Sequence, residues 1–190
     1  MTAAFQSALA GLVTGEDVRH SMPGLADRDA RRIDLLHGDP GVVVMRTLYM
    51  SWRLTKVLSL LPMTTRALGD EPAAIHLRRF WQESRARSLH FVDECLAFLG
   101  YLEAQAQGMT PIVIDAMALE RARLELRAQA SRGEAPVPRR VRLRHSSSAL
   151  LGADGSAERS PALPAPVVLE VRLGTDGRED LAVLGFDEEQ

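Results

Sequence analysis

Four kinds of side chain in this sequence could do chemistry: histidines, a single cysteine, neighbouring acids and clustered arginines. His90 and Glu94 lie four residues apart in a segment with helical periodicity, so a helix would place them on one face. An imidazole and a carboxylate can bind a transition metal, but a metal site needs at least three converging ligands. Only a residue from elsewhere, such as His76, could complete such a site. We therefore favour an exposed pair at the helix edge and expect no metal ion.

Cys95 and the adjacent acids are weak candidates for catalytic groups. A cysteine acts as a nucleophile only where its pKa is lowered and its thiol is accessible. Cys95 instead falls in the apolar stripe of Phe91 and Phe98, which predicts a buried thiol. Adjacent helix residues such as Asp93 and Glu94 point in different directions, so they make poor general acid and base partners. The sequence also lacks the GxSxG, Walker A, GxGxxG and HExxH motifs, and we predict no catalytic residues in this chain.

A cluster of arginines is the remaining chemical feature. Arg140, Arg142 and Arg144 alternate in a segment with strand periodicity, so they would share one face of a β-strand. Such a face could bind an acidic peptide, a phosphate backbone or an acidic partner protein. It could equally be the solvated face of an edge strand, where positive charge opposes aggregation. The sequence leaves both interpretations open.

Composition limits the class of protein. The chain has 190 residues, of which 46% are hydrophobic, and a formal net charge of −2. These values fit one domain with a real core or two small ones, with no general attraction to nucleic acid or to a membrane. One cysteine excludes an internal disulfide, a zinc ribbon and an iron–sulfur cluster. We find neither a transmembrane pattern nor a signal peptide, so we expect a cytoplasmic protein.

Hydrophobic periodicity predicts helices over the first 130 residues. Their expected positions are Ala3–Val13, Asp27–Leu36, Val42–Leu61, Thr64–Leu68, a segment from Glu71, a segment from Ser88, and Ile112–Ala130. The segment Val42–Leu61 has almost no polar face, which predicts a helix at the centre of its domain. Trp52 and Trp81 are expected to be core anchors. Charges alternate in the second half of the last helix, so we expect that half to be exposed.

After residue 130 the periodicity changes from helical to alternating. The segments Val141–Arg144, Val167–Leu173 and Leu181–Leu184 are typical of strands, and the turn Gly174–Gly177 joins the last two as a hairpin. We therefore predict an α+β protein. It has a helical bundle at residues 1–130, followed by a small antiparallel sheet with a peptide-binding edge at residues 131–190.

The order of these features resembles a known family. A very apolar long helix is followed by Leu68-Gly-Asp-Glu71, by a helix with Phe80-Trp81, and by the segment from Phe91 to Leu99. The chain continues with Pro111-Ile-Val-Ile-Asp-Ala-Met-Ala-Leu-Glu-Arg-Ala122, which resembles the family's signature of proline, hydrophobic residues, aspartate, alanine, leucine and glutamate. From about Val43 to Leu126 the chain is similar to the MbnC-like partner subunits of methanobactin biosynthesis. These proteins act beside TIM-barrel, multinuclear non-haem iron oxidases that modify ribosomally made peptides.

The resemblance implies a role, a partner and a place for the chemistry. Members of the family form a stable heterodimer with the iron oxidase and help to bind the leader of the precursor peptide. The oxidase holds the iron and converts a cysteine of the peptide core to an oxazolone with a neighbouring thioamide. By this resemblance the present chain is an accessory subunit with no cofactor of its own.

The small predicted sheet offers a way to bind such a leader, because an open edge can take up an extended peptide as an additional strand. We expect either Val167–Leu173 or its hairpin partner Leu181–Leu184 to supply that edge. The predicted peptide-binding residues are Val167, Val168, Leu169, Val171, Leu173, Arg142 and Arg144. The residues that we expect to contact the iron oxidase are Asp115, Glu120 and Arg121.

Three alternatives stay open on the sequence alone. The chain could serve a different ribosomal-peptide pathway with the same kind of partner. It could be a helical DNA-binding regulator that places Arg139–Arg144 on the phosphate backbone, although its net charge is negative and it has no clear helix-turn-helix pair. It could also be a small metal-dependent enzyme built around His90 and Glu94.

Overall fold

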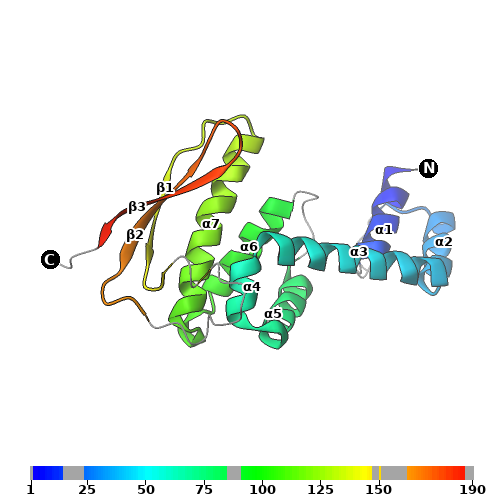
Figure 1. Ribbon diagram of the computed structural model, residues 1–190. Coiled ribbons are helices and arrows are strands. Elements are labelled where there is room, and N and C mark those ends of the chain that lie inside the picture. Colours follow the sequence, from blue (N-terminus) through cyan, green and yellow to red (C-terminus); the bar gives the residue numbers. More distant parts are fainter. Residues whose placement is uncertain (1, 15–23, 85–90, 147–149, 151–161, 187–190) are drawn as a thin grey trace. The chain divides into compact units, whose positions relative to one another are not determined.

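The chain forms an α+β structure in which helices come first and strands last, as predicted. The computed structural model describes residues 2–14, 24–84, 91–146, 150 and 162–186 (Figure 1). The chain divides into two compact units, unit 1 (residues 1–56) and unit 2 (residues 57–190). The division differs from the boundary suggested after residue 130, because the sheet shares a hydrophobic core with helices of unit 2.

Unit 1 is a small helical assembly. It contains α1 (Ala3–Thr14), α2 (Asp27–His37) and the first part of α3 (Pro40–Leu60). Its buried residues are Ala8, Leu12, Ile33 and Val42. The guanidinium of Arg46 on α3 donates hydrogen bonds from Nη2 (2.8 Å) and Nε (3.3 Å) to the carbonyl oxygen of Leu12. The last carbonyl groups of a helix have no partner within it, so this contact satisfies the end of α1 and attaches it to α3.

The long helix α3 is not the central helix that its composition predicted. Leu48 is 60% exposed, Val44 56% and Met45 54%, and Trp52 is also exposed rather than a core anchor. Within unit 1, only Val42 and Arg53 of α3 are buried. The prediction was wrong because an apolar surface all round a helix needs packing partners on every side. The helices of unit 1 cover only part of α3.

The central helix is α7 (Pro111–Ser131), which belongs to unit 2. Around it lie α4 (Pro62–Leu68), α5 (Asp70–Glu83), α6 (Phe91–Glu103) and a short 3₁₀ helix, η2 (Ala106–Gly108). Figure 1 shows α7 between the sheet and the other helices of this unit. One side of α7 packs in the core with the sheet through Ala116, Leu119, Ala122 and Leu126. The other side packs against α5 and α6 through Val113, Met117 and Leu124.

The two buried sides of α7 explain why the expected exposure of its second half was wrong. Leu124, Leu126 and Ala128 are all buried there. The charged residues that alternate with them, Arg121, Arg123, Glu125 and Arg127, form ion pairs. Arg121 donates to Glu103 over 2.7 Å, for example. A helix that packs on two sides shows no single apolar stripe, and its charge pattern then resembles that of an exposed helix.

The sheet has three antiparallel strands in the order β1-β2-β3: β1 (Arg139–Leu143), β2 (Val167–Leu173) and β3 (Glu179–Phe186). The prediction of all three strands is confirmed, and the bounds of β2 match. Val141 of β1 pairs with Leu169 of β2, and both side chains are buried on the face toward α7. A register shift between Val168 and Leu169 introduces an irregularity in the β2–β3 pairing.

A buried carboxylate attaches α4 to α7. Glu120 is 1% exposed, and its two oxygens accept hydrogen bonds from the backbone N–H groups of Met63 (2.6 Å) and Thr64 (2.9 Å). These groups belong to the first turn of α4, whose N–H donors have no partner within the helix. Leu61, the residue before the helix, forms no side-chain cap. Glu120 therefore performs the capping function from another helix, which positions α4.

A second buried carboxylate attaches the end of β1 to α7. Oδ2 of Asp115 accepts hydrogen bonds from the backbone N–H of Arg144 (2.7 Å) and of His145 (2.8 Å). The same oxygen lies 2.9 Å from Nδ1 of His145. Asp115 is 4% exposed, so the three donors supply the stabilisation that water would otherwise give its charge. The end of β1 is fixed against the first turns of α7 as a result.

Burial raises the pKa of Glu120 to about 7, although the N–H groups of Met63 and Thr64 favour its charged form. The folded protein therefore keeps this proton at pH values at which the unfolded chain has lost it. The contribution of Glu120 to the free energy of unfolding is then complete below pH 4.5, the usual glutamate value, and is lost as the pH rises through 7.

We predict that Glu120→Gln destabilises the protein, and most strongly at acidic pH. The glutamine NH₂ would face one of the two backbone donors, so a buried hydrogen bond is lost, at a cost of about 1–3 kcal/mol. Urea unfolding at about pH 5 and about pH 8 measures the difference from the wild type, which should shrink at the higher pH. Glu125→Gln is the matched control on the same helix, because it removes only partly exposed ion pairs, worth about 0–1 kcal/mol. Equal stability of Glu120→Gln and wild type at the lower pH would contradict the capping role.

Candidate functional site

The edge of the sheet at β3 is the candidate peptide-binding site. The strand β2 pairs with β1 on one side and with β3 on the other, so the prediction that Val167–Leu173 supplies an open edge is wrong. Local periodicity identified the strand, but strand order depends on long-range pairing that periodicity does not encode. Within the described residues no strand pairs with the far side of β3. The predicted alternative, Leu181–Leu184, therefore lies on an edge strand.

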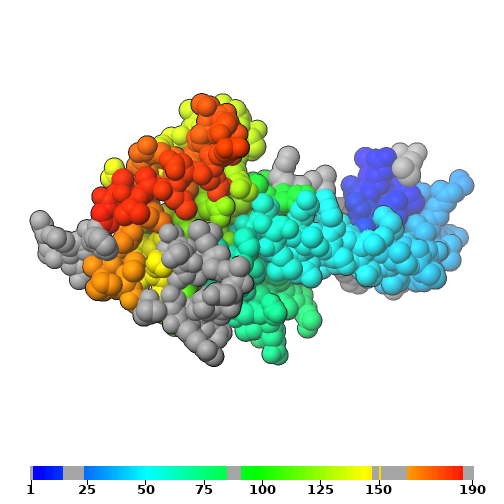
Figure 2. Space-filling model, in the orientation of Figure 1, coloured from blue at the N-terminus to red at the C-terminus, as the bar shows by residue number. Residues whose placement is uncertain are grey.

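Apolar side chains are exposed along β3. Val183 is 66% exposed, Leu184 46% and Leu181 36%. Val183 pairs with Leu169 and Leu181 pairs with Val171, so both lie on the face whose β2 residues are buried against α7. The core covers that face at β1 and β2 but leaves it open at β3. Figure 2 shows the atoms of β3 (red) at the surface.

One ion-pair cluster holds β3 against α7. Glu179 at the start of β3 contacts Arg123 and lies 2.7 Å from Nε of Arg127, and its side chain is only 12% exposed. A carboxylate between two guanidinium groups is strongly favoured at such a largely buried position. This contact was not predicted from the sequence. The only signal was the complementary charge, which does not specify a partner about 50 residues away.

The arginine face is present, but it lies away from the β3 edge. Arg140, Arg142 and Arg144 are exposed on or just after β1, as predicted, and they lie on the face opposite to the buried Val141 and Leu143. Because neighbouring strands are about 4.8 Å apart, β1 lies about 10 Å from β3. The predicted peptide-binding residues Arg142 and Arg144 therefore do not line this edge.

The charge of the arginine face is partly neutralised. Glu170 on β2, with 8% exposure, lies 3.7 Å from Nε of Arg140 and also contacts Arg172. This arrangement is typical of a solvated sheet face with cross-strand ion pairs. It weakens the case for a phosphate-binding surface at β1.

The residues predicted to contact the iron oxidase are mostly internal. Asp115 and Glu120 are buried and form the two attachments of α7 described above, so their side chains are not available at the surface for the predicted contact with the iron oxidase. Arg121 reaches the surface, where it pairs with Glu103. The charged residues of the segment Pro111–Ala122 thus have structural roles within this chain.

The candidate metal and nucleophile residues can be placed only in part. His90 lies outside the described residues. Glu94 accepts a hydrogen bond from Nε1 of Trp81 (2.8 Å), and no group of three metal-ligating side chains converges in the part of the chain that the structure describes. Cys95 is fully buried in the core, as predicted. Burial raises the pKa of its thiol to about 12, with smaller contributions from the Glu94 and Glu120 carboxylates.

Comparison of the sequence with protein-family models and with curated proteins gave no match. In the described residues, no helix has the combination of length and apolarity that crossing a bilayer requires.

We predict that Cys95 does not react with a thiol-specific disulfide reagent while the protein is folded. With a pKa of about 12, about one thiol in ten thousand is ionised at pH 8, and the reagent cannot reach it. Absorbance should show one reactive thiol per chain in denaturant and a reaction limited by unfolding in its absence. Rapid labelling of the folded protein would contradict the burial of this residue.

Proposed function

We propose that this chain is the non-catalytic partner subunit of an iron-dependent, peptide-modifying oxidase, and that it binds the leader of the precursor peptide along β3. The observation that carries the proposal is the edge strand β3. Among the described residues no strand pairs with its outer side, and the side chains of Val183 and Leu184 are exposed. Exposed apolar edge strands promote aggregation, so proteins usually shield or charge them. An edge left apolar is best explained by a strand that binds there.

Strand addition would give the leader both affinity and selectivity. Backbone hydrogen bonds to β3 supply affinity for any extended peptide, and side chains at alternate positions supply selectivity. On one face the added strand would meet Leu181 and Val183, and on the other it would meet Asp180 and Ala182. Directly opposite side chains in an antiparallel pair are about 5 Å apart. We therefore expect a leader segment with apolar residues at every second position.

The proposed heterodimer places the iron and the oxidation of the core cysteine in the larger subunit. The resemblance of residues 43–126 to the partner family supports that assignment. The exposed apolar residues of α3, Val44, Met45 and Leu48, also fit a chain that binds another protein, because large exposed apolar patches are typical of interaction surfaces. In methanobactin biosynthesis the product would be an oxazolone with a neighbouring thioamide. Another ribosomal-peptide pathway would use the same division of labour.

A proline scan of β3 tests the proposed edge. Proline removes the backbone N–H, so a proline at a position whose N–H points away from β2 should block the added strand without breaking the β2–β3 pairing. Among proline variants of Leu181, Ala182, Val183 and Leu184, those that fold should bind the leader at least tenfold more weakly. Fluorescence anisotropy of a labelled leader measures the affinity, and circular dichroism reports folding.

The matched control is the other edge of the same sheet. Proline at Arg140 or Arg142 of β1 should leave the affinity for the leader unchanged in any variant that folds. Unchanged affinity in every folded β3 variant would refute leader binding at β3. If only the β1 variants lost affinity for the leader, the leader would bind at the arginine face instead.

A further inference from the structure

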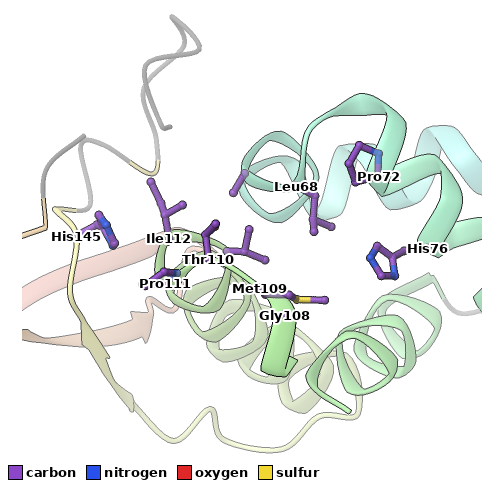
Figure 3. Close-up of a pocket in the computed structure, with 11 residues that line it drawn as sticks. Leu68, Pro72, His76, Gly108, Met109, Thr110, Pro111, Ile112 and His145 are labelled. Carbon is purple, nitrogen blue, oxygen red and sulfur yellow. The ribbon is translucent and has the colours of Figure 1, made fainter. Parts of the chain in front are cut away.

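Two apolar features of the described residues lie outside the β3 edge. The first is a pocket of about 590 Å³ in unit 2, lined by Leu68, Met109 and Ile112 among others. Figure 3 shows His76 and His145 at opposite ends of this lining, with the start of α7 between them, so the two imidazoles do not meet at one ligand. The second feature is the exposed side of α3 in unit 1, whose residue pattern indicates what binds there.

The exposed side of α3 carries no charge from residue 43 to residue 55. The charged residues of this stretch lie on the other side of the helix, where Arg46 donates to the carbonyl oxygen of Leu12 and Arg53 is 3% exposed. Two uncharged surfaces can pair without burying a charge, whereas a charged partner surface would find no counterpart here. We call this surface the α3 face. Its exposed residues are Val43, Val44, Met45, Thr47, Leu48, Ser51, Trp52, Leu54 and Thr55.

The residue pattern of the α3 face is symmetric about Ser51. Leu48 and Leu54 lie three residues before and after it, and Thr47 and Thr55 lie four residues before and after it. Residues three and four positions apart share one side of a helix, and all five of these residues are exposed. The α3 face therefore presents nearly the same side chains in either direction along the helix.

A surface with this symmetry fits a second copy of itself. In a two-fold contact, residue i of one copy meets residue j of the other, and j meets i. When two α3 helices cross antiparallel with the axis at Ser51, each Leu48 lies at the level of Leu54 in the second copy. Each Thr47 likewise lies at the level of Thr55 in the second copy. Like side chains then meet at both levels, which an unrelated partner would have to match by chance.

Small side chains in the middle of the α3 face allow a close approach of two helices. Thr47, Ser51 and Thr55 are four residues apart and form a row with larger apolar residues on both sides. The hydroxyl of Thr47 donates to the carbonyl oxygen of Val43 (3.0 Å), and the hydroxyl of Thr55 donates to that of Ser51 (3.0 Å). Because these two hydroxyls bond within the helix, a second copy can cover them without leaving a buried donor unsatisfied.

We propose that α3 binds α3 of a second copy of this chain, antiparallel and with the two-fold axis at Ser51. The large apolar residues of the α3 face, which are between 38% (Leu54) and 60% (Leu48) exposed, are then covered on both copies at once. One helix from each copy makes a small contact, so we expect a weak dimer with a Kd of about 1 μM or higher. The proposal does not depend on leader binding or on the iron oxidase, because the β3 edge belongs to unit 2.

Sedimentation of the full chain alone tests the dimer. Between about 1 and 300 μM the wild type should shift from monomer to dimer and go no further, because a two-fold contact is closed. Ser51→Arg brings two guanidinium groups together at the axis and should weaken the dimer at least about tenfold. Since Ser51 is exposed, this variant should fold. Leu35→Arg is the matched control, because Leu35 is 79% exposed on α2 of the same unit and should not affect the dimer.

Three results of this experiment would overturn the proposal. They are a monomer at every concentration, equal dimerisation of Ser51→Arg and the wild type, and an equal loss in Leu35→Arg. A monomeric chain whose Ser51→Arg variant no longer co-elutes with the iron oxidase would assign the α3 face to that oxidase instead.

Disulfide crosslinking tests the antiparallel arrangement. With the axis at Ser51, the two thiols of Ser51→Cys meet and should form a crosslinked dimer under mild oxidation. Two copies of Thr47→Cys are about 12 Å apart along the helices, too far for a disulfide, but Thr47→Cys should crosslink to Thr55→Cys in a mixture. Cys95 is buried and does not contribute. Crosslinking of Thr47→Cys to itself, or none in Ser51→Cys, would refute this arrangement.

Discussion

The structure of unit 2 depends on two buried carboxylates of α7. Asp115 and Glu120 are five residues apart, which turns them about 140° from each other around the helix. One attaches the end of β1 and the other attaches the start of α4. A buried carboxylate is costly unless donors surround it, and here those donors are backbone N–H groups that would otherwise lack partners. Each contact therefore satisfies both groups and fixes the position of a neighbouring element.

The proposed peptide-binding edge follows from this framework. Asp115 fixes the end of β1 against α7, and Glu120 fixes the start of α4. On the other side of α7, the core residues Leu169 and Val171 hold the sheet, while Arg123 and Arg127 bind Glu179 at the start of β3. The edge strand is thus supported at its beginning, and among the described residues no strand pairs with its outer side, which is what strand addition requires.

Hydrophobic periodicity predicted where the helices and strands lie in the sequence. It could not predict which of them pack against one another. The alternation in Val167–Leu173 gave the bounds of β2, because period-two alternation is a local property of a half-buried strand. It could not show that this strand lies between two others. The charges of α7 were read as exposed because the partners of Glu120 lie 57 and 56 residues away in the sequence. The apolar composition of α3 implied burial, but the described helices of unit 1 leave Leu48 exposed.

The central claim is that this chain works as one subunit of an iron oxidase complex. The most direct test is co-expression with a TIM-barrel iron oxidase of the kind that MbnC-like subunits accompany. Size exclusion and iron analysis of each subunit then follow. The account predicts co-elution at one-to-one stoichiometry, with all the iron in the larger chain. Separate elution of the two chains, or iron that remains with this chain after they are separated, would contradict it.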